Sequence, residues 1–190
     1  MRSGFMGIAI LAVSTILLAG CAQPRTDGPI ADRPSFNGCI PVPAGGQLFI
    51  NSVTIDPADA EGGQEMTIDV VRDSQRREGV IEVTPVLASA DDFIPGFLVP
   101  SGDPFFEGLE FTRFPASFTP EDGIVSVGVL VQFADDVSAD GSEPVIVTDG
   151  IEYTIEDLGT FVLESRRSVW LTREPVESDE FCAAFHQAIE

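Results

Sequence analysis

The strict alternation of apolar and polar residues along several short segments is the feature that most constrains this chain. In residues 123–133, four valines and a phenylalanine occupy every second position. Residues 65–71 follow the same rule, with Met66, Ile68 and Val70 on one face. A period of two residues is typical of a β-strand with one buried face. We therefore expect strands in both segments, and the valine-rich one is expected at the centre of a sheet.

Similar segments recur at regular spacing, and clusters of Gly, Pro, Asp and Ser separate them. Many short strands with turns between them predict an all-β chain that forms an antiparallel β-sandwich, broadly immunoglobulin-like. The cysteine pair flanking a tryptophan that marks a true immunoglobulin domain is missing. The further strands are expected at 47–55, 80–87, 105–114, 145–154 and 160–171. Ile81 and Val83 are expected on one face of the strand at 80–87, and residues 73–79 are expected to form a polar turn.

Three local signals refine this expectation. Asp149-Gly150 lies between two alternating runs, which predicts a β-hairpin with a two-residue type I′ turn. The apolar parity shifts around 165–167, which indicates a β-bulge. Pro85 interrupts an otherwise regular strand pattern, so that strand is expected to lie at an edge or to contain a bulge.

The end of the chain changes character, and residues 178–189 are predicted to form a short C-terminal α-helix. Ser178 can cap the helix, and two acidic residues follow in its first turn. The apolar face of this helix would carry Phe181, Cys182, Phe185 and Ile189.

The first twenty residues form a separate unit. Arg2 precedes an apolar run, 8–18, that is shorter than the roughly 20 residues a membrane-spanning helix needs. The small residues Ala19 and Gly20 then precede Cys21. This order is typical of a secretory signal peptide over residues 1–20.

The sequence Leu18-Ala19-Gly20-Cys21 resembles the lipobox of bacterial lipoproteins, and the resemblance covers only the signal peptide and its cleavage site. It implies that Cys21 becomes the mature N-terminus and carries a diacylglyceryl group with palmitate-type chains, a stable membrane anchor. Because Ala22 rather than Asp follows, the resemblance implies the outer membrane in a bacterium with two membranes. In a bacterium with one membrane it implies the outer face of the cell membrane. An ordinary secretory signal and a retained transmembrane anchor are the alternatives.

Charge excludes one class of partner. All ten basic residues are arginines, against 31 acidic residues, and the net charge is −21. Cleavage before Cys21 would remove Arg2 and no acid, which makes the net charge −22. Such a chain repels DNA, RNA and anionic headgroups, so we exclude nucleic-acid binding. The acid excess indicates solubility, or alternatively affinity for divalent cations or a cationic partner.

The residues after the signal peptide are enough for one domain preceded by a tether. Residues 21–38 are rich in Pro, Gly, Asp and Arg, and we expect a flexible tether there. Residues 39–190 are expected to form a single domain. Cys39 and Cys182 are an even pair in an exported chain, which predicts a disulfide worth roughly 4–5 kcal/mol through loop closure. A pair of free thiols is the alternative.

Few residues offer catalytic chemistry. The single histidine, His186, is four residues from Cys182, so a thiol–imidazole pair is geometrically conceivable. The expected disulfide and the terminal position argue against it. Zinc sites need more Cys and His residues than this chain has. We therefore predict no catalytic residues and no cofactor.

One acidic loop is a weak candidate for calcium. Asp136, Ser138 and Asp140 alternate before a glycine and resemble the first half of an EF-hand loop. The glutamate that should close such a loop is absent, because position 147 is Val. An acidic loop in water is the simpler interpretation.

A phenylalanine cluster has two interpretations. If the rings point inward, they belong to the core of the sandwich, which is the favoured interpretation. If several point outward, they form a contact patch for a partner or an apolar ligand. The cluster consists of Phe105, Phe106, Phe111, Phe114 and Phe118.

Together these features predict a lipid-anchored β-sandwich of the cell envelope that binds or scaffolds another envelope or extracellular component and is not an enzyme. One alternative is a hydrolase, or an enzyme subunit, that acts on glycans through carboxylates. A second alternative is a calcium-stabilised adhesion domain.

Overall fold

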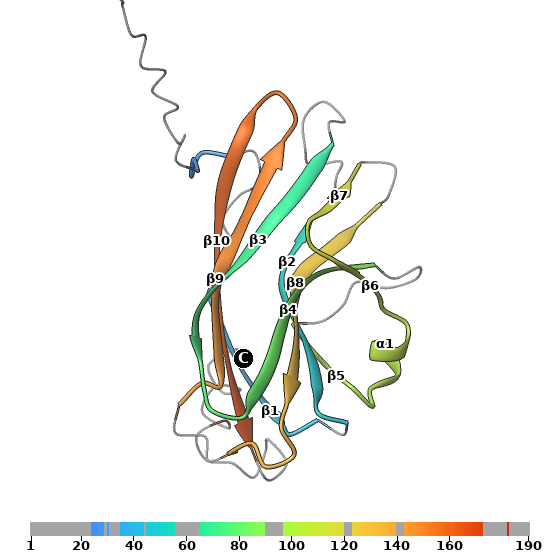
Figure 1. Ribbon diagram of the computed structural model, residues 1–190, viewed down its shortest axis with the longest axis vertical. Coiled ribbons are helices and arrows are strands. Elements are labelled where there is room, and N and C mark those ends of the chain that lie inside the picture. Colours follow the sequence, from blue (N-terminus) through green and yellow to red (C-terminus); the bar gives the residue numbers. More distant parts are fainter. Residues whose placement is uncertain are drawn as a thin grey trace, which may run out of the picture.

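The computed structural model describes residues 24–28, 30, 35–43, 45–55, 65–89, 97–119, 123–139, 143–172 and 182. Two five-stranded sheets pack face to face (Figure 1). The predicted all-β sandwich is confirmed.

The first sheet has the strand order β1-β10-β9-β3-β7. All of its pairs are antiparallel except the one between β1 and β10 at one edge. Its strands are β1 (Phe36–Pro41), β3 (Met66–Arg76), β7 (Ala116–Phe118), β9 (Ile146–Ile155) and β10 (Gly159–Thr172).

The second sheet has the order β5-β2-β8-β4-β6, and every pair in it is antiparallel. The expected central position of the valine-rich strand is confirmed, since β8 is the middle strand. Its strands are β2 (Gln47–Ile55), β4 (Val80–Ser89), β5 (Leu98–Pro100), β6 (Glu110–Arg113) and β8 (Val125–Phe133).

The main core lies between the two sheets. The alternating valines of β8 and its Phe133 are buried there, as the pattern predicts. Pro85 pairs with Val129 of β8, one residue before β4 begins to pair with β6 at Val86. The proline therefore occupies a stretch of β4 that is locally an edge, which agrees with the expectation.

The chain enters the sandwich earlier than the sequence suggests. Strand β1 begins at Phe36 and pairs in parallel with β10, from Phe36 opposite Arg167 to Pro41 opposite Thr172. The domain therefore starts inside the stretch 21–38 in which we expect a tether. A parallel edge pair leaves no hairpin turn in the sequence, which is why alternation and turn signals do not reveal it.

The hairpin predicted at Asp149-Gly150 is wrong. Both residues lie inside the continuous strand β9. The turn that joins β9 to β10 comes later, at 156–158, where Asp157 has φ +66° and Gly159 follows with φ +103°.

Gly150 serves a different purpose, because it faces the bulge in β10. The register shift between Glu164 and Arg167 confirms the predicted bulge. Gly150 has φ +135°, and a Cβ there would lie 2.1 Å from the carbonyl oxygen of Leu163. The glycine is thus required by a close approach of two strands and not by a turn.

Bulges also correct two predicted faces and one boundary. A register shift between Ile68 and Val70 turns Val70 to the surface, where it is 45% exposed. A second shift at the start of β4 leaves Ile81 66% exposed. Strand β3 also continues to Arg76, inside a segment expected to be a turn. Each bulge inserts one residue and so reverses the facing of the residues beyond it.

The single strand expected over 105–114 is wrong as well. The segment instead begins with a short helix, α1 (Pro104–Glu107), which is followed by β6 and then by β7. The Asp103 carboxylate accepts a hydrogen bond from the Phe105 amide at 2.8 Å, and Pro104 begins the helix. An Asp cap followed by Pro is a helix start signal.

The predicted C-terminal helix at 178–189 lies outside the described residues except for Cys182, which is helical. The signal peptide and Cys21 lie outside them too.

Candidate functional site

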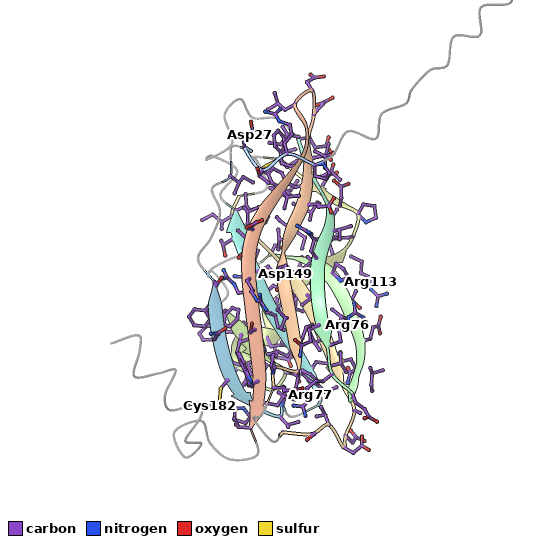
Figure 2. The ribbon with its side chains drawn as sticks, turned by 90° about the vertical axis from the view of Figure 1, so that its left-hand side faces the viewer. Asp27, Arg76, Arg77, Arg113, Asp149 and Cys182 are labelled. Carbon is purple, nitrogen blue, oxygen red and sulfur yellow. A yellow bond between two sulfur atoms is a disulfide. The ribbon has the colours of Figure 1, made fainter. Side chains whose placement is uncertain are left out.

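Two loops form a depression of about 280 Å³ at the end of the sandwich that also carries Cys182. We call it the Arg77 depression; Figure 2 shows Arg77 and Cys182 at this end and Asp27 at the opposite end. One loop is the turn between β3 and β4, and the other follows β8. Its lining residues are Arg77, Glu78, Gly79, Asp136, Val137 and Ser138.

A backbone hydrogen bond joins the two loops, since the amide of Ala134 donates to the carbonyl of Gly79 at 2.8 Å. Within the β3–β4 turn, the amide of Val80 donates to the carbonyl of Arg77 at 3.3 Å. Gly79 has φ +93°, and a Cβ there would lie 2.7 Å from the Val137 side chain. Only glycine allows both this backbone conformation and this close approach.

Arg77 is hydrogen-bonded to the segment that precedes β9. Its amide donates to the carbonyl of Val145 at 2.9 Å, and its guanidinium donates to the carbonyl of Glu143 at 3.2 Å. The depression therefore presents a positioned cation beside the carboxylates of Glu78 and Asp136 and the hydroxyl of Ser138. The sequence around Asp136 does not predict that Arg77 lies nearby, because a local pattern cannot show that two loops distant in the chain meet.

The calcium candidate is only partly described. Asp136 and Ser138 line the Arg77 depression, whereas Asp140 lies outside the described residues. Across the described ranges, no three His, Cys, Asp or Glu side chains gather as a metal ion would need. A guanidinium that lines the same depression opposes the binding of a cation there.

The phenylalanine cluster divides between core and surface. Phe118 is in the main core, and Phe114 packs against it. Phe106 and Phe111 pack on a second apolar cluster that includes Phe49. Phe105 alone of the five is largely exposed, at 59%. The core interpretation thus holds for four of the five rings. A continuous exposed patch of all five is excluded.

The predicted disulfide is confirmed. The sulfur atoms of Cys39 and Cys182 lie 2.00 Å apart, and the bond joins positions separated by 143 residues. Cys39 lies in β1 opposite Trp170 of β10, so the bond ties the chain's end to the edge strand. His186 lies outside the described residues.

A second site, which no sequence pattern indicates, is the attachment of residues 24–28 to the sandwich. We call these residues the N-terminal segment. The Arg25 amide donates to the carbonyl of Thr160 at 3.0 Å, and the Val162 amide donates to the carbonyl of Arg25 at 2.6 Å. These two bonds place Arg25 beside Phe161 as a parallel bridge on β10.

Side chains reinforce this attachment. The Arg25 guanidinium lies 5.1 Å from the centroid of the Phe161 ring, which itself stacks on buried Tyr153 at 5.5 Å. A Cβ on Gly28 would lie 2.2 Å from the Tyr153 hydroxyl oxygen. Ile30 is only 8% exposed and belongs to the main core. The described part of the expected tether is therefore bound to the domain.

An ion pair stiffens the N-terminal segment. The Arg25 guanidinium and the Asp27 carboxylate form two hydrogen bonds of 2.8 and 2.9 Å. Hydrogen bonding to the guanidinium lowers the pKa of Asp27, and the same contact raises the pKa of Arg25. Both groups are exposed, so solvent screens the pair.

No protein-family model matches the chain, and no curated protein or solved structure matches it. None of the helices within the described ranges has the length and apolar character that crossing a membrane requires.

Proposed function

We propose that the protein is a lipid-anchored module of the cell envelope that binds or scaffolds another envelope or extracellular component without catalysing a reaction. The lipid would be attached at Cys21 after cleavage of residues 1–20. The sandwich would hold its partner on the surface that faces away from the membrane.

The observation that carries this proposal is the closeness of the lipobox to the folded domain. Cys21 precedes Arg25 by four residues, and Arg25 is already hydrogen-bonded to β10. The lipobox-like sequence is therefore followed almost directly by a stable sandwich. This order suits a protein that presents its folded domain close to a membrane.

The character of the Arg77 depression supports binding. Arg77, Glu78 and Asp136 offer both charge signs on two fixed loops. Mixed polar groups of this kind are typical of the rim of a protein–protein interface.

The membrane location is tested by fractionating cells that express the wild-type chain or Cys21→Ser. We expect the wild-type protein in the membrane fraction and the variant outside it. A wild-type protein that is free in the medium would overturn the anchor.

The binding role is tested by cross-linking and capture from the membranes with three forms: wild type, Arg77→Ala and Arg113→Ala. Arg113 is an exposed arginine on β6, so it matches the lost charge at a different surface. We expect a specific companion that Arg77→Ala loses and Arg113→Ala keeps. Equal capture by all three forms would contradict the role of the Arg77 depression.

A second candidate is the carboxylate-dependent glycan hydrolase, because Glu78 and Asp136 line the same depression. Such enzymes use two carboxylates, one as acid and one as base or nucleophile. Release of sugar fragments from cell-wall glycan that is lost in both Glu78→Gln and Asp136→Asn would favour this candidate. Turnover that neither variant changes would dismiss it.

A further inference from the structure

The attachment of the N-terminal segment bears on how the sandwich stands on a membrane. We define the hairpin end as the end with the β9–β10 turn at 156–158, and the disulfide end as the end with Cys182. Figure 1 shows the N-terminal segment beside the tips of β9 and β10. Figure 2 shows Asp27 and Cys182 at opposite ends.

Covalent geometry limits the distance from the lipid to the hairpin end. Only three residues separate Cys21 from Arg25, and a fully extended chain spans at most about 14 Å over these four steps. Arg25 is fixed beside Phe161, two residues after the start of β10. A lipid on Cys21 would therefore hold the hairpin end close to the headgroups.

The Arg77 depression lies well away from this point. The Arg77 amide donates to Val145, whose own amide donates to the carbonyl of Val169 in β10. Val169 is eight residues beyond Phe161, which is about 26 Å along the strand at 3.3 Å per residue. The N-terminal segment and the depression thus occupy opposite ends of one long strand.

Charge gives the long face of the first sheet no net attraction to a bilayer. This sheet exposes both arginines and acids, such as Arg72, Arg166, Asp69 and Glu164. The hairpin end exposes acids around Leu158, namely Glu65, Glu156 and Asp157. A chain with a net charge of −21 gains nothing by laying a long face on headgroups, anionic ones above all. The acids around Leu158 also keep the turn out of the hydrocarbon, because burying carboxylates is costly.

We infer that the bilayer surface is the partner of the hairpin end, so that the sandwich stands end-on with the Arg77 depression facing away from the membrane. This inference rests on the proposed lipid anchor. In this arrangement the N-terminal segment, bound to β10, sets the orientation of the sandwich relative to the bilayer. The disulfide end is then the surface that other molecules can reach.

The test uses the full lipidated protein in vesicles of phosphatidylethanolamine and phosphatidylcholine that contain a gadolinium-chelating lipid. One spin label is placed at Leu158→Cys or at Asp135→Cys, with the native disulfide intact. Asp135 is exposed in the loop that forms the Arg77 depression. We expect relaxation enhancement several-fold larger at position 158 than at position 135.

A flexible Gly/Ser linker of about 20 residues inserted between Gln23 and Pro24 provides the control, because it leaves the fold untouched. Such a linker adds a root-mean-square reach of about 25 Å. We expect the enhancement at position 158 to fall toward the value at position 135. Equal enhancement at both positions in the protein without the linker would overturn the end-on orientation. A protein that carries no lipid and does not bind the vesicles would instead overturn the proposed anchor.

Discussion

The hydroxyl of Ser165 in β10 donates a hydrogen bond of 2.8 Å to the backbone carbonyl of Ser52 in β2 and so links the two sheets inside the core. Both residues are fully buried. Each lies where its strand changes register, between Asn51 and Val53 in β2 and between Glu164 and Arg167 in β10. The two bulges therefore face each other, and this hydrogen bond gives a partner to a buried carbonyl that lies at a break in the strand pairing.

We expect Ser165→Ala to lower the free energy of unfolding by about 1–3 kcal/mol, because it leaves a buried carbonyl without this donor. Chemical denaturation measures the change. Ser117→Ala is the matched control, since the Ser117 hydroxyl bonds Thr67 at the exposed surface. Equal stability of the Ser165 variant and the wild type would show that the inter-sheet bond contributes nothing.

The disulfide should contribute more than any single hydrogen bond. Replacing Cys39 and Cys182 with serine should lower the free energy of unfolding by about 2–5 kcal/mol, since a long closed loop restricts the unfolded chain. Denaturation curves with and without a thiol reductant give the measurement. The wild type should lose stability in reductant, whereas the double variant should not respond. If the reductant did not change the denaturation curve of the wild type, even under conditions in which the chain unfolds fully, the result would contradict the disulfide.

Gly28→Val should release the N-terminal segment, because any side chain there collides with Tyr153. The readout is the rate of tryptic cleavage after Arg25, whose backbone is bonded to β10 in the wild type. We expect faster cleavage in Gly28→Val than in the wild type. Thr26→Val, an isosteric change at an exposed neighbour, should cleave like the wild type. Equal rates for all three would mean that the segment is not bound in solution.

The ion pair in the N-terminal segment makes a prediction about pH. Arg25 lowers the pKa of the Asp27 carboxyl in the folded chain. The pair therefore stabilises the bound segment at neutral pH, and this stabilisation is lost as the pH falls through the folded-state pKa of Asp27. NMR titration of the carboxyl carbon should give a lowered pKa that returns toward its ordinary value in Arg25→Ala. Arg113→Ala should leave it lowered, and an ordinary pKa in the wild type would contradict the pair.

Calcium should not stabilise the domain through the Arg77 depression, because Arg77 repels a cation placed beside Asp136. We expect the same melting temperature in excess calcium and in a chelator. A calcium-dependent rise that Asp136→Ala or Asp140→Ala removes would instead support the calcium-stabilised adhesion domain.

The sequence predicts where most strands lie, including the bulged strands β2 and β10, but it misassigns the facing of two residues at bulges. Residues 47–55 form β2 with the expected bounds, and β8 is central as its valines indicate. Val70 points outward because one residue is inserted before it, and Ile81 points outward because it is itself the residue inserted between Val80 and Glu82. The parity shift at 165–167 locates the bulge in β10, whereas the alternation does not reveal the bulges in β3 and β4.

Turn chemistry is misleading in one place and decisive in another. Asp149-Gly150 has the composition of a tight turn, yet Gly150 is needed where β10 approaches closely. Asp103-Pro104 is a helix start signal, but the phenylalanines after it have high strand propensity and favour a strand instead. A tertiary contact therefore decides the first case, and the local cap of Asp103 decides the second.

The candidate sites are the least predictable part of the molecule. The disulfide follows from counting cysteines, since the lipobox claims one of three. The Arg77 depression joins two loops that are far apart in the chain, and the bridge at Arg25 is a backbone contact that any residue type could make. Neither leaves a local pattern. Both appear only once the strands are paired.

The intact mass of the protein purified from its own membranes shows whether Cys21 anchors this sandwich. We expect a chain that lacks residues 1–20, carries a diacylglyceryl group and is lighter by two protons for one disulfide. A chain that retains residues 1–20, or one that begins at Cys21 without lipid, would contradict the anchor.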